Sequence, residues 1–305
     1  MNAGDTKPPL LSEDAWLECL LDQALLEDVG GGDVSTSLAV PPDRLARARL
    51  VARAEGVLAG VPLLARIYAR LDDGVRVTPV RTDGAAVRPG DLVAEIGGPA
   101  GPILTGERMA LNFLQHLSGI ATLTARYVAA AAGTGCAVLD TRKTVPGYRH
   151  LAKYAVCCGG GRNHRLGLYD RVMFKDNHWI AAGRDIDVLV RAARQRYPVL
   201  DVEVEVDTLD QLARVLPLQV EWVLLDNFTP EQAATAVAMR ARLGVHGTRL
   251  EASGNVDLAS VRAYAEAGVD AVSVGRLTHS APALDLGLDL ELEPAGDRDT
   301  GRSPG

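Results

Sequence analysis

The sequence contains few aromatic residues and no apolar stretch long enough to cross a membrane. Phe, Trp and Tyr make up 4% of the 305 residues, so the core must be built mainly from Ala, Val and Leu. A transmembrane helix needs about 20 consecutive apolar residues, and no uninterrupted run approaches that length. The N-terminal stretch MNAGDTKPPLLSED lacks the basic segment followed by an apolar one that is typical of a secretion signal. We therefore expect a cytoplasmic protein that does not interact with membranes.

Basic charge and paired cysteines are also scarce. The formal net charge is −7 and the isoelectric point is near 5.4, which argues against nonspecific nucleic-acid binding because phosphate contacts need a basic surface. The four cysteines, Cys19, Cys136, Cys157 and Cys158, form no C-x-x-C pair, and adjacent cysteines make a strained disulfide. We predict reduced thiols in the core and no zinc site.

Positive charge is nevertheless concentrated in one segment, residues 137–178. It holds eight Lys and Arg against three Asp and no Glu, a balance of 8 − 3 = +5. The cations that follow short apolar runs or a glycine triplet in this segment are Arg142, Lys143, His164, Arg165 and Lys175. Most charge runs form a solvated surface. The alternative is a pocket for a polyanionic small molecule.

The first part of the chain has the pattern of a small mixed domain. Period-two apolar stretches separated by Pro-Gly and Asp-Gly turns predict antiparallel strands over 74–104. The other elements that we predict are a helix from Ser12 to about Asp28, a strand within 45–60, a helix over 61–71 and a helix over 105–132 with a break at Gly119. We place this domain at residues 12–118, expect 281–293 to pack back on it, and assign 1–11 and 294–305 to tails.

From residue 136 onward, apolar strands alternate with helices. The strand candidates are Ala137–Leu139, Arg171–Phe174, Val202–Val206, Val220–Leu225, Arg249–Ala252 and Ala271–Val274. The main helical stretches between them are Ile186–Tyr197, Pro230–Leu243 and Leu258–Ala267. Such alternation predicts an α/β fold with a parallel sheet, in a domain over 119–280. Six strands are too few for an eight-unit barrel, which leaves a smaller barrel or an open doubly wound sheet.

The ends of these strands carry polar residues. They are Arg142, Lys143, Lys175, Glu205, Asp226, Ser253, Gly254 and Gly275. In parallel α/β folds ligands bind at the carboxyl ends of the strands. Cations, two carboxylates and glycine turns together suit a phosphate-rich substrate with a divalent metal.

Several of these residues also have purely structural interpretations. Glu205 shares a strand face with Glu203 and could pair in the core with Arg142 or Lys175. Asp226 could cap the helix that begins near Pro230. The turn at 253–255 is typical of a phosphate-binding turn before a helix, but also of any strand-to-helix connection.

Three further features of the sequence also have more than one interpretation. His164 beside Arg165 could be a surface pair. The triplet Gly159–Gly161 lacks the strand-and-helix context of a dinucleotide-binding fingerprint. Arg108 lies in the first turn of the helix predicted over 105–132, where a cation opposes the helix dipole, and this mildly favours a functional role.

The chain resembles the quinolinate phosphoribosyltransferase family, also named nicotinate-nucleotide pyrophosphorylases (decarboxylating). The motifs that carry the resemblance follow the family's order over about residues 12 to 290. They are E-D-x-G-x-G-D at 27–33, G-E-R-x-A-L-N-F-L-Q-x-L-S-G-I-A-T at 106–122, D-T-R-K-T-x-P-G at 140–147, K-Y-A-V-x-x-G-G-G-x-N-H-R at 153–165, K-D-N-H at 175–178, E-V-E-V-D at 203–207, L-L-D-N at 224–227, E-A-S-G at 251–254 and S-V-G-x-L-T-H-S at 273–280.

The resemblance implies both an activity and a fold. The reaction converts quinolinate and phosphoribosyl pyrophosphate to nicotinate mononucleotide, pyrophosphate and carbon dioxide, with Mg²⁺, in de novo NAD synthesis. The fold is an N-terminal α/β sandwich followed by an incomplete, seven-stranded α/β barrel. Family members form dimers or larger assemblies, and the residue that matches Arg108 enters the neighbouring subunit's site.

The resemblance also implies residue roles. The catalytic positions are Lys143, Lys175, Glu205 and Asp226, of which Glu205 and Asp226 also match the metal site. The substrate-binding positions are Arg108, Arg142, Lys143, His164, Arg165, Lys175, Ser253, Gly254, Gly275 and His279. Many relatives have Gly where this chain has Asn255, and Asn tolerates the left-handed backbone that the turn needs.

Two competing functions remain at this stage. One is that of a molybdenum-transport-associated paralogue of the family, which usually lacks the K-D-N-H segment. The other is a non-catalytic barrel that only binds nucleotides, for which an incomplete set of ionic residues at the strand ends is expected.

Overall fold

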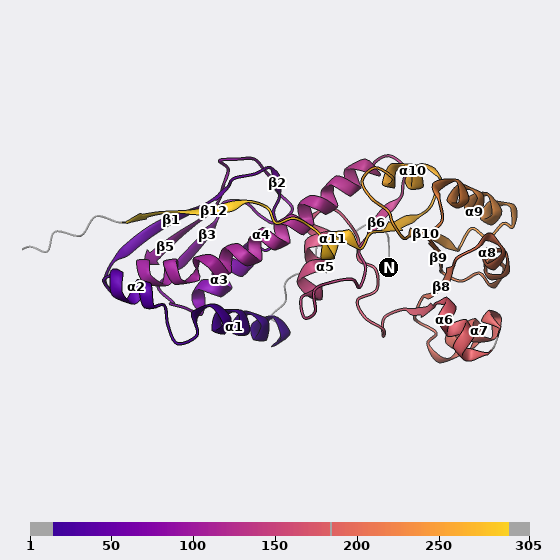
Figure 1. Ribbon diagram of the computed structural model, residues 1–305, viewed down its shortest axis with the longest axis horizontal. Helices are drawn as coiled ribbons and strands as arrows, with labels where there is room; N and C mark the ends of the chain where they lie inside the picture. Colours follow the sequence, from indigo (N-terminus) through magenta and orange to yellow (C-terminus); the bar gives the residue numbers. More distant parts are fainter. Residues whose placement is uncertain (1–14, 184, 293–305) are drawn as a thin grey trace, which may run out of the picture. The chain divides into compact units, whose positions relative to one another are not determined.

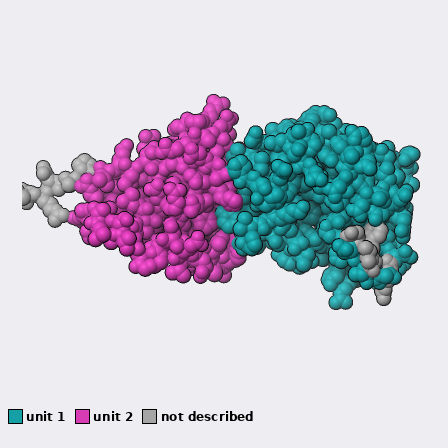
Figure 2. Space-filling view, viewed as in Figure 1, with its two compact units in different colours: residues 1–9, 119–282 teal, residues 10–118, 283–305 magenta. Residues whose placement is uncertain are grey.

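The computed structural model describes residues 15–183 and 185–292. These residues form two compact units, one of residues 15–118 with 283–292 and the other of residues 119–282 (Figure 2). The helix α4 (Ala100–Ala130) contributes residues to both units.

The unit of residues 119–282 is built on a parallel sheet with the strand order β6-β11-β10-β9-β8-β7. The strands are β6 (Ala137–Leu139), β7 (Val172–Phe174), β8 (Val202–Val206), β9 (Trp222–Asp226), β10 (Arg249–Ser253) and β11 (Ala271–Ser273). They are the six strands predicted from the sequence, to within two residues at each end. Every residue of β8 is buried, as expected for a strand covered on both faces. The α/β class is confirmed.

The seventh strand implied by the family resemblance is represented by a single bridge. Arg162 pairs in parallel with Leu139 at the outer edge of β6, through hydrogen bonds that link it to Val138 and Asp140. Within the described ranges, β6 and β7 do not pair with each other, so the barrel is incomplete and open at this point.

The helices of this unit mostly follow the strands (Figure 1). They are α5 (Arg149–Cys158), α6 (Asp176–Ala182), α7 (Ile186–Arg196), α8 (Leu209–Val215) with the 3-10 turn η1 (Leu216–Leu218), α9 (Pro230–Arg242), α10 (Val261–Glu266) and α11 (Arg276–His279). Thr229 caps α9 in a reciprocal capping box with Gln232. The interpretation of Asp226 as the cap of this helix is therefore wrong.

The glycine triplet ends α5 and lets the following loop pack against α4. A Cβ atom on Gly159 would lie 2.3 Å from the backbone oxygen of Ala121, and one on Gly161 would lie 2.7 Å from the Thr124 side chain. Only glycine allows this approach, because a real Cβ would overlap the neighbouring helix. The close contact fixes the loop that carries His164.

The other unit contains an antiparallel sheet with the order β12-β1-β5-β3 and a short ribbon of β2 and β4. The bounds of its elements are α1 (Ala15–Val29), α2 (Val34–Ala39), β1 (Leu45–Ala52), β2 (Gly56–Val57), α3 (Val61–Ala69), β3 (Arg76–Pro79), β4 (Ala86–Val87), β5 (Leu92–Pro99) and β12 (Leu286–Leu292). Buried and exposed residues alternate along most of β1, so one sheet face lies in the core. The late strand β12 pairs with β1, and the first half of α4 also belongs to this unit (Figure 1).

Helix α4 differs from the prediction at its start and in its middle. It begins at Ala100, because Pro102 falls in the first turn, where its missing N–H group removes no hydrogen bond. It continues through Gly119, since the flanking Ile120 is fully buried and packing outweighs the cost of about 1 kcal/mol for a helical glycine. Arg108 therefore lies in the third turn, and the argument from the helix dipole does not apply to it.

The remaining expectations concern thiols, membrane spans and the chain ends. All four cysteines are free, but only Cys158 is buried and Cys19 is exposed, so the placement of all four in the core is wrong. No helix within the described ranges is long and apolar enough to cross a membrane. The cap at Ser12 and the tails 1–11 and 294–305 lie outside the described residues.

Candidate active site

A cavity of about 440 Å³ lies at the carboxyl ends of the parallel strands. Its walls contain eight of the residues singled out from the sequence, which are Arg142, Lys143, His164, Arg165, Lys175, Glu205, Asp226 and Ser253. Because these residues lie in or just after five different strands and in one loop, only the folded sheet brings them to one place. The basic segment therefore does not form a dispersed, solvated surface.

The other predicted residues, Gly254, Gly275, His279 and Arg108, are not among those that line this cavity. Gly254 follows Ser253 directly. A Cβ on Gly275 would lie 3.1 Å from Lys143 Cδ and 3.2 Å from His279 Nε2, so the glycine allows these two side chains to approach. Arg108 belongs to the other unit, where its side chain is exposed.

The cationic wall of the cavity contains two neighbouring guanidinium groups and a buried donor without a partner among the described residues. Burial and the nearby charge of Arg142 both lower the pKa of Arg165, which means that two guanidinium groups face the same space. The Nε atom of Arg142 is buried and has no hydrogen-bond partner among the described residues. Because a buried donor without a partner costs about 1–3 kcal/mol, an anion that enters the cavity would relieve this cost.

The acidic side of the cavity is formed by Glu205 and Asp226. Lys175 pairs with Glu205, as the structural interpretation of Glu205 proposed, yet both side chains line the cavity. Burial raises the pKa of Glu205, and the charge of Asp226 raises it further while Lys175 opposes the shift. Two carboxylates that interact in this way attract a divalent cation or a positively charged reaction centre.

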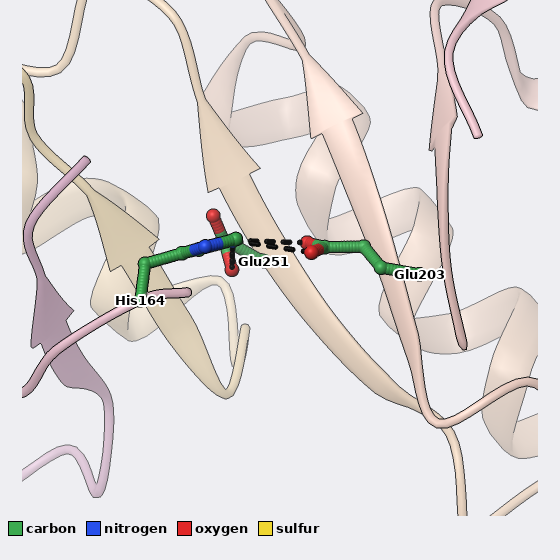
Figure 3. Close-up of side chains that lie close together, drawn as sticks. All are labelled: His164, Glu203 and Glu251. Atoms are coloured by element: carbon green, nitrogen blue, oxygen red, sulfur yellow. Dashed lines mark hydrogen bonds and ion pairs between the residues drawn. The ribbon is translucent and has the colours of Figure 1, made fainter. Parts of the chain in front are cut away.

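His164, Glu203 and Glu251 form a buried cluster (Figure 3), of which His164 and Glu251 line the cavity. His164 Nε2 lies 3.1 Å from Glu203 Oε2 and 3.4 Å from Glu251 Oε2. Arg171 Nη1 donates to Glu203 Oε2 over 3.2 Å. His164 is only 8% exposed, so its interpretation as part of a surface pair is wrong.

Two interactions of the His164 ring favour different protonation states. Burial lowers its pKa, but the interactions with the carboxylates of Glu203 and Glu251 outweigh burial and raise the pKa to about 9. The backbone N–H of Arg165 donates to Nδ1 over 2.7 Å, which requires a free electron pair on that atom. In both states the proton on Nε2 points toward the two carboxylates.

A buried ion pair holds the backbone of His164. Lys153 and Asp140 pair with side-chain exposures of 3% and 0%. Lys153 Nζ donates to the His164 carbonyl oxygen over 2.9 Å, and the His164 N–H donates to Asp140 Oδ1 over 3.0 Å. Burial raises the pKa of Asp140 to about 6 although Lys153 opposes the shift. The pair thus fixes both backbone groups of the residue at the centre of the cluster.

The turn after β10 has the left-handed backbone that the sequence predicted. Gly254 has φ +89° and Asn255 has φ +53°. A Cβ on Gly254 would lie 2.2 Å from Asn227 Oδ1, so a side chain is excluded there. The helix expected directly after the turn begins only at Val261, so anion binding at this turn depends on backbone amides and on Ser253.

Sequence reasoning missed several residues of the cavity wall. They are Thr141, Met173, Leu224, Glu251 and Ser273. A signal existed for Glu251, because it precedes Ser253 by two positions and alternate residues of a strand share a face. The pairing of Asp140 with Lys153 had no comparable signal, since it joins a strand end to a helix.

Two groups of residues present metal-binding atoms. Glu205 and Asp226 offer carboxylate oxygens, which Mg²⁺ prefers. The ligating atoms of His164, Glu203 and Glu251 lie within 4.8 Å of one another, but Arg171 Nη1 lies 3.4 Å from His164 Nε2. Because that guanidinium group already supplies positive charge, the cluster is less suited to a second cation.

Comparison with known proteins finds one family over both parts of the chain. The sequence models of the quinolinate phosphoribosyl transferase N-terminal and C-terminal domains match residues 33–118 and 120–289. The chain is 44% identical to the nicotinate-nucleotide pyrophosphorylase [carboxylating] of Mycobacterium leprae, over 88% of this chain and 95% of that protein. It is also 44% identical to a probable nicotinate-nucleotide pyrophosphorylase [carboxylating] of Synechocystis sp., over 93% of this chain and 94% of that protein.

A solved structure agrees with these matches. The crystal structure of NadC from Streptococcus pyogenes superimposes with a TM-score of 0.86 at 40% sequence identity. The alignment covers 93% of this chain and 100% of that chain. The likeness thus extends over both units of the fold.

The buried pair of Asp140 and Lys153 generates a prediction about stability. We expect Asp140→Asn to reduce the free energy of unfolding by about 3–5 kcal/mol, because Lys153 would be left buried and charged without its partner. Urea unfolding measures this loss. The double variant Asp140→Asn, Lys153→Met removes the uncompensated charge and should recover part of the stability. A single variant as stable as the parent protein would contradict this account of the pair.

Proposed function

This chain belongs to the quinolinate phosphoribosyl transferase family, and we propose that it catalyses the family reaction in de novo NAD biosynthesis. The enzyme transfers the phosphoribosyl group of phosphoribosyl pyrophosphate to the ring nitrogen of quinolinate. Pyrophosphate and carbon dioxide leave, and nicotinate mononucleotide forms. The observation that carries the proposal is that Arg142, Arg165 and Lys175 line one cavity. The Nε atom of Arg142 is buried there without a hydrogen-bond partner among the described residues.

The cationic wall suits the two carboxylates of quinolinate. A planar guanidinium group binds a carboxylate through two parallel hydrogen bonds, and Arg142 and Arg165 both face the cavity. The mutual repulsion of the two cations falls when a dianion lies between them. Lys175 adds positive charge beside the same space, and His164 also lines it.

The part of the cavity that Ser253 lines suits the phosphorylated sugar. Ser253 and the left-handed turn at Gly254 present a hydroxyl group and backbone amides for the 5-phosphate. Lys143 lies in contact distance of Gly275 and beside His279, which places two basic side chains together at this end. In this arrangement the sugar phosphate and the pyridine ring bind on different walls of one cavity.

Charge balance explains how these side chains accelerate the reaction. As pyrophosphate leaves, the C1 atom of the ribose becomes positively charged, and the carboxylates Glu205 and Asp226 stabilise that charge. Lys143 offsets the charge of the leaving group. The nitrogen of the pyridine ring becomes positive once it is alkylated, and it then accepts the electron pair that the departing carboxylate leaves on the ring.

We also propose that the reaction uses Mg²⁺, for which Glu205 and Asp226 fit as oxygen ligands. When bound, Mg²⁺ would neutralise negative charge on the pyrophosphate group. The upward influence of Asp226 on the pKa of Glu205 supports this assignment, because it reflects repulsion that a cation relieves.

The assembly and the cellular location belong to the same proposal. We assign the enzyme to the cytoplasm, with four free thiols as support. We propose a homodimer or larger homo-oligomer in which Arg108 reaches the cavity of the neighbouring subunit. The support is that Arg108 is exposed and makes no side-chain hydrogen bond or ion pair within the described residues.

The activity itself is tested with purified protein, quinolinate, phosphoribosyl pyrophosphate and Mg²⁺. We expect carbon dioxide, pyrophosphate and nicotinate mononucleotide in equal amounts, measured by release of labelled carbon dioxide and by mass spectrometry. Omission of any one component should abolish product formation. A folded protein that forms none of these products would refute the proposed function.

The cationic wall generates a second prediction, for Arg165→Ala. Loss of the guanidinium group should raise the KM for quinolinate about thirtyfold, because a charge-assisted hydrogen bond contributes about 2 kcal/mol. The KM for phosphoribosyl pyrophosphate should change much less. Arg191→Ala, which removes an exposed arginine of α7, is the matched control. Equal effects on the two substrates would argue against this placement of quinolinate.

The shared site is tested by mixing two inactive variants, Arg108→Ala and Lys175→Ala. After subunit exchange, a hybrid assembly should contain sites with both residues intact, and part of the activity should return. A mixture of Arg165→Ala with Lys175→Ala should stay inactive, because both residues come from the same subunit. If exchange is demonstrated by labelled subunits and no activity returns, Arg108 does not act across subunits.

A further inference from the structure

Glu251 is a buried carboxyl group on the cavity wall that the proposed roles do not yet use. It lies in β10, its side chain is fully buried, and it borders the same cavity as Arg165 and Ser253. Neither of its oxygens has a hydrogen-bond partner among the described residues. His164 Nε2 lies 3.4 Å from Oε2, an ion-pair distance without hydrogen-bond geometry (Figure 3). A buried carboxylate would not be stable in this state.

The neighbouring charges indicate that Glu251 is neutral. Burial raises the pKa of Glu203, but hydrogen bonds and charge from His164 and Arg171 outweigh it, and the pKa of Glu203 is lowered. Glu203 is thus the ionised member of the pair. Burial and the negative charge of Glu203 both raise the pKa of Glu251, with His164 opposing. The two carboxyl groups are therefore driven to different protonation states, as expected for interacting acids.

Geometry leads to the same assignment independently of the pKa values. The backbone N–H of Arg165 donates to His164 Nδ1 over 2.7 Å, so Nδ1 carries no proton in this geometry, although Glu203 and Glu251 raise the pKa of the ring. With a proton on Nε2 alone the ring is neutral, and Arg171 then pairs with Glu203. A second carboxylate at Glu251 would then lack any counter-charge in the cluster. Both oxygens of Glu251 are without a hydrogen-bond partner in the described part of the protein, and the group lines the cavity, so a bound ligand can accept its proton.

The substrate of the proposed function brings such an acceptor. Quinolinate presents carboxylates to this wall, and a neutral carboxyl group can lie against a carboxylate where an ionised one would repel it. The reaction also needs a proton on the ring carbon that loses its carboxylate. A neutral acid at the wall meets both requirements.

We propose that Glu251 is the general acid that protonates the C2 atom of the pyridine ring when carbon dioxide leaves. The proposal rests on the proposed function, and it adds a catalytic residue to that reaction. Glu203 and His164, which lie beside Glu251, and Arg171, which pairs with Glu203, act as positioning residues that keep its proton in place.

The step balances in atoms and electrons. In the alkylated intermediate the bond between C2 and the carboxylate breaks, carbon dioxide leaves, and the electron pair stays on C2 beside the positive ring nitrogen. That pair takes the proton of Glu251 and forms the C2–H bond. Glu251 becomes a carboxylate and regains a proton from water after the product has left.

The test uses Glu251→Gln in the full-length protein under single-turnover conditions. Glutamine keeps the shape and neutrality of the acid but cannot transfer a proton. We expect pyrophosphate release to continue, whereas release of carbon dioxide slows by about a hundredfold, a typical effect of general acid catalysis. The mononucleotide that still carries the 2-carboxylate should accumulate, and mass spectrometry detects it. Glu266→Gln, on the exposed part of α10, is the control with unchanged rates.

Other measurements keep the inference falsifiable if the glutamine variant folds poorly. Glu251→Asp retains a carboxyl group and should release carbon dioxide faster than Glu251→Gln. In the parent enzyme, release of carbon dioxide should fall as the pH rises above the pKa of Glu251, because the acid form is the donor.

Two outcomes overturn the role of Glu251. One is that Glu251→Gln releases both products at the rates of the parent enzyme. The other is that it loses both releases in parallel, which would assign Glu251 to binding or to the first step. A parent enzyme that releases neither product refutes the proposed function instead.

Discussion

The structure depends on how charge is compensated at one end of a parallel sheet. Burial of an ionised side chain is costly unless a partner of opposite charge and hydrogen bonds replace water. Around the cavity, Asp140 is matched by Lys153 and Glu203 by Arg171. Arg142 Nε and both oxygens of Glu251 are left without hydrogen-bond partners within the described ranges, and these residues line the cavity. The buried charges behind the cavity are thus paired, whereas polar atoms of two residues that line the cavity have no hydrogen-bond partner in the described part of the chain.

This division gives each charged residue a clear physical role. Asp140 and Lys153 hydrogen-bond to the backbone N–H and carbonyl groups of His164. The position of the His164 ring is therefore set by the protein before any substrate binds. The pair of Lys175 and Glu205 lies in the cavity itself, and Lys175 is 44% exposed. That pair can exchange its partners for substrate groups at small cost, because a partly exposed ion pair contributes little stability.

Local patterns in the sequence predicted the strands well and some of their connections poorly. The six parallel strands were visible because each is a short apolar run bounded by polar or glycine residues. The start of α4 was missed because residues 100–104 were assigned to the region of antiparallel strands, although proline at position 102 is compatible with a first helical turn. The role of Asp226 remained open because Thr229, three residues later, is an equally good cap and only the structure distinguishes them.

The sequence by itself determined the alternation of strands and helices, the excess of cations in residues 137–178 and the motifs of the family, since all of these are properties of neighbouring residues. Only the tertiary structure decided that Glu203 accepts a hydrogen bond from Arg171 while Glu251 has no hydrogen-bond partner among the described residues, and that Asp140 pairs with Lys153. These contacts join residues that are far apart in the chain, and they depend on strand order and loop path. Burial and the distance to the nearest opposite charge set the protonation of a carboxyl group, and neither quantity exists until the sheet has formed.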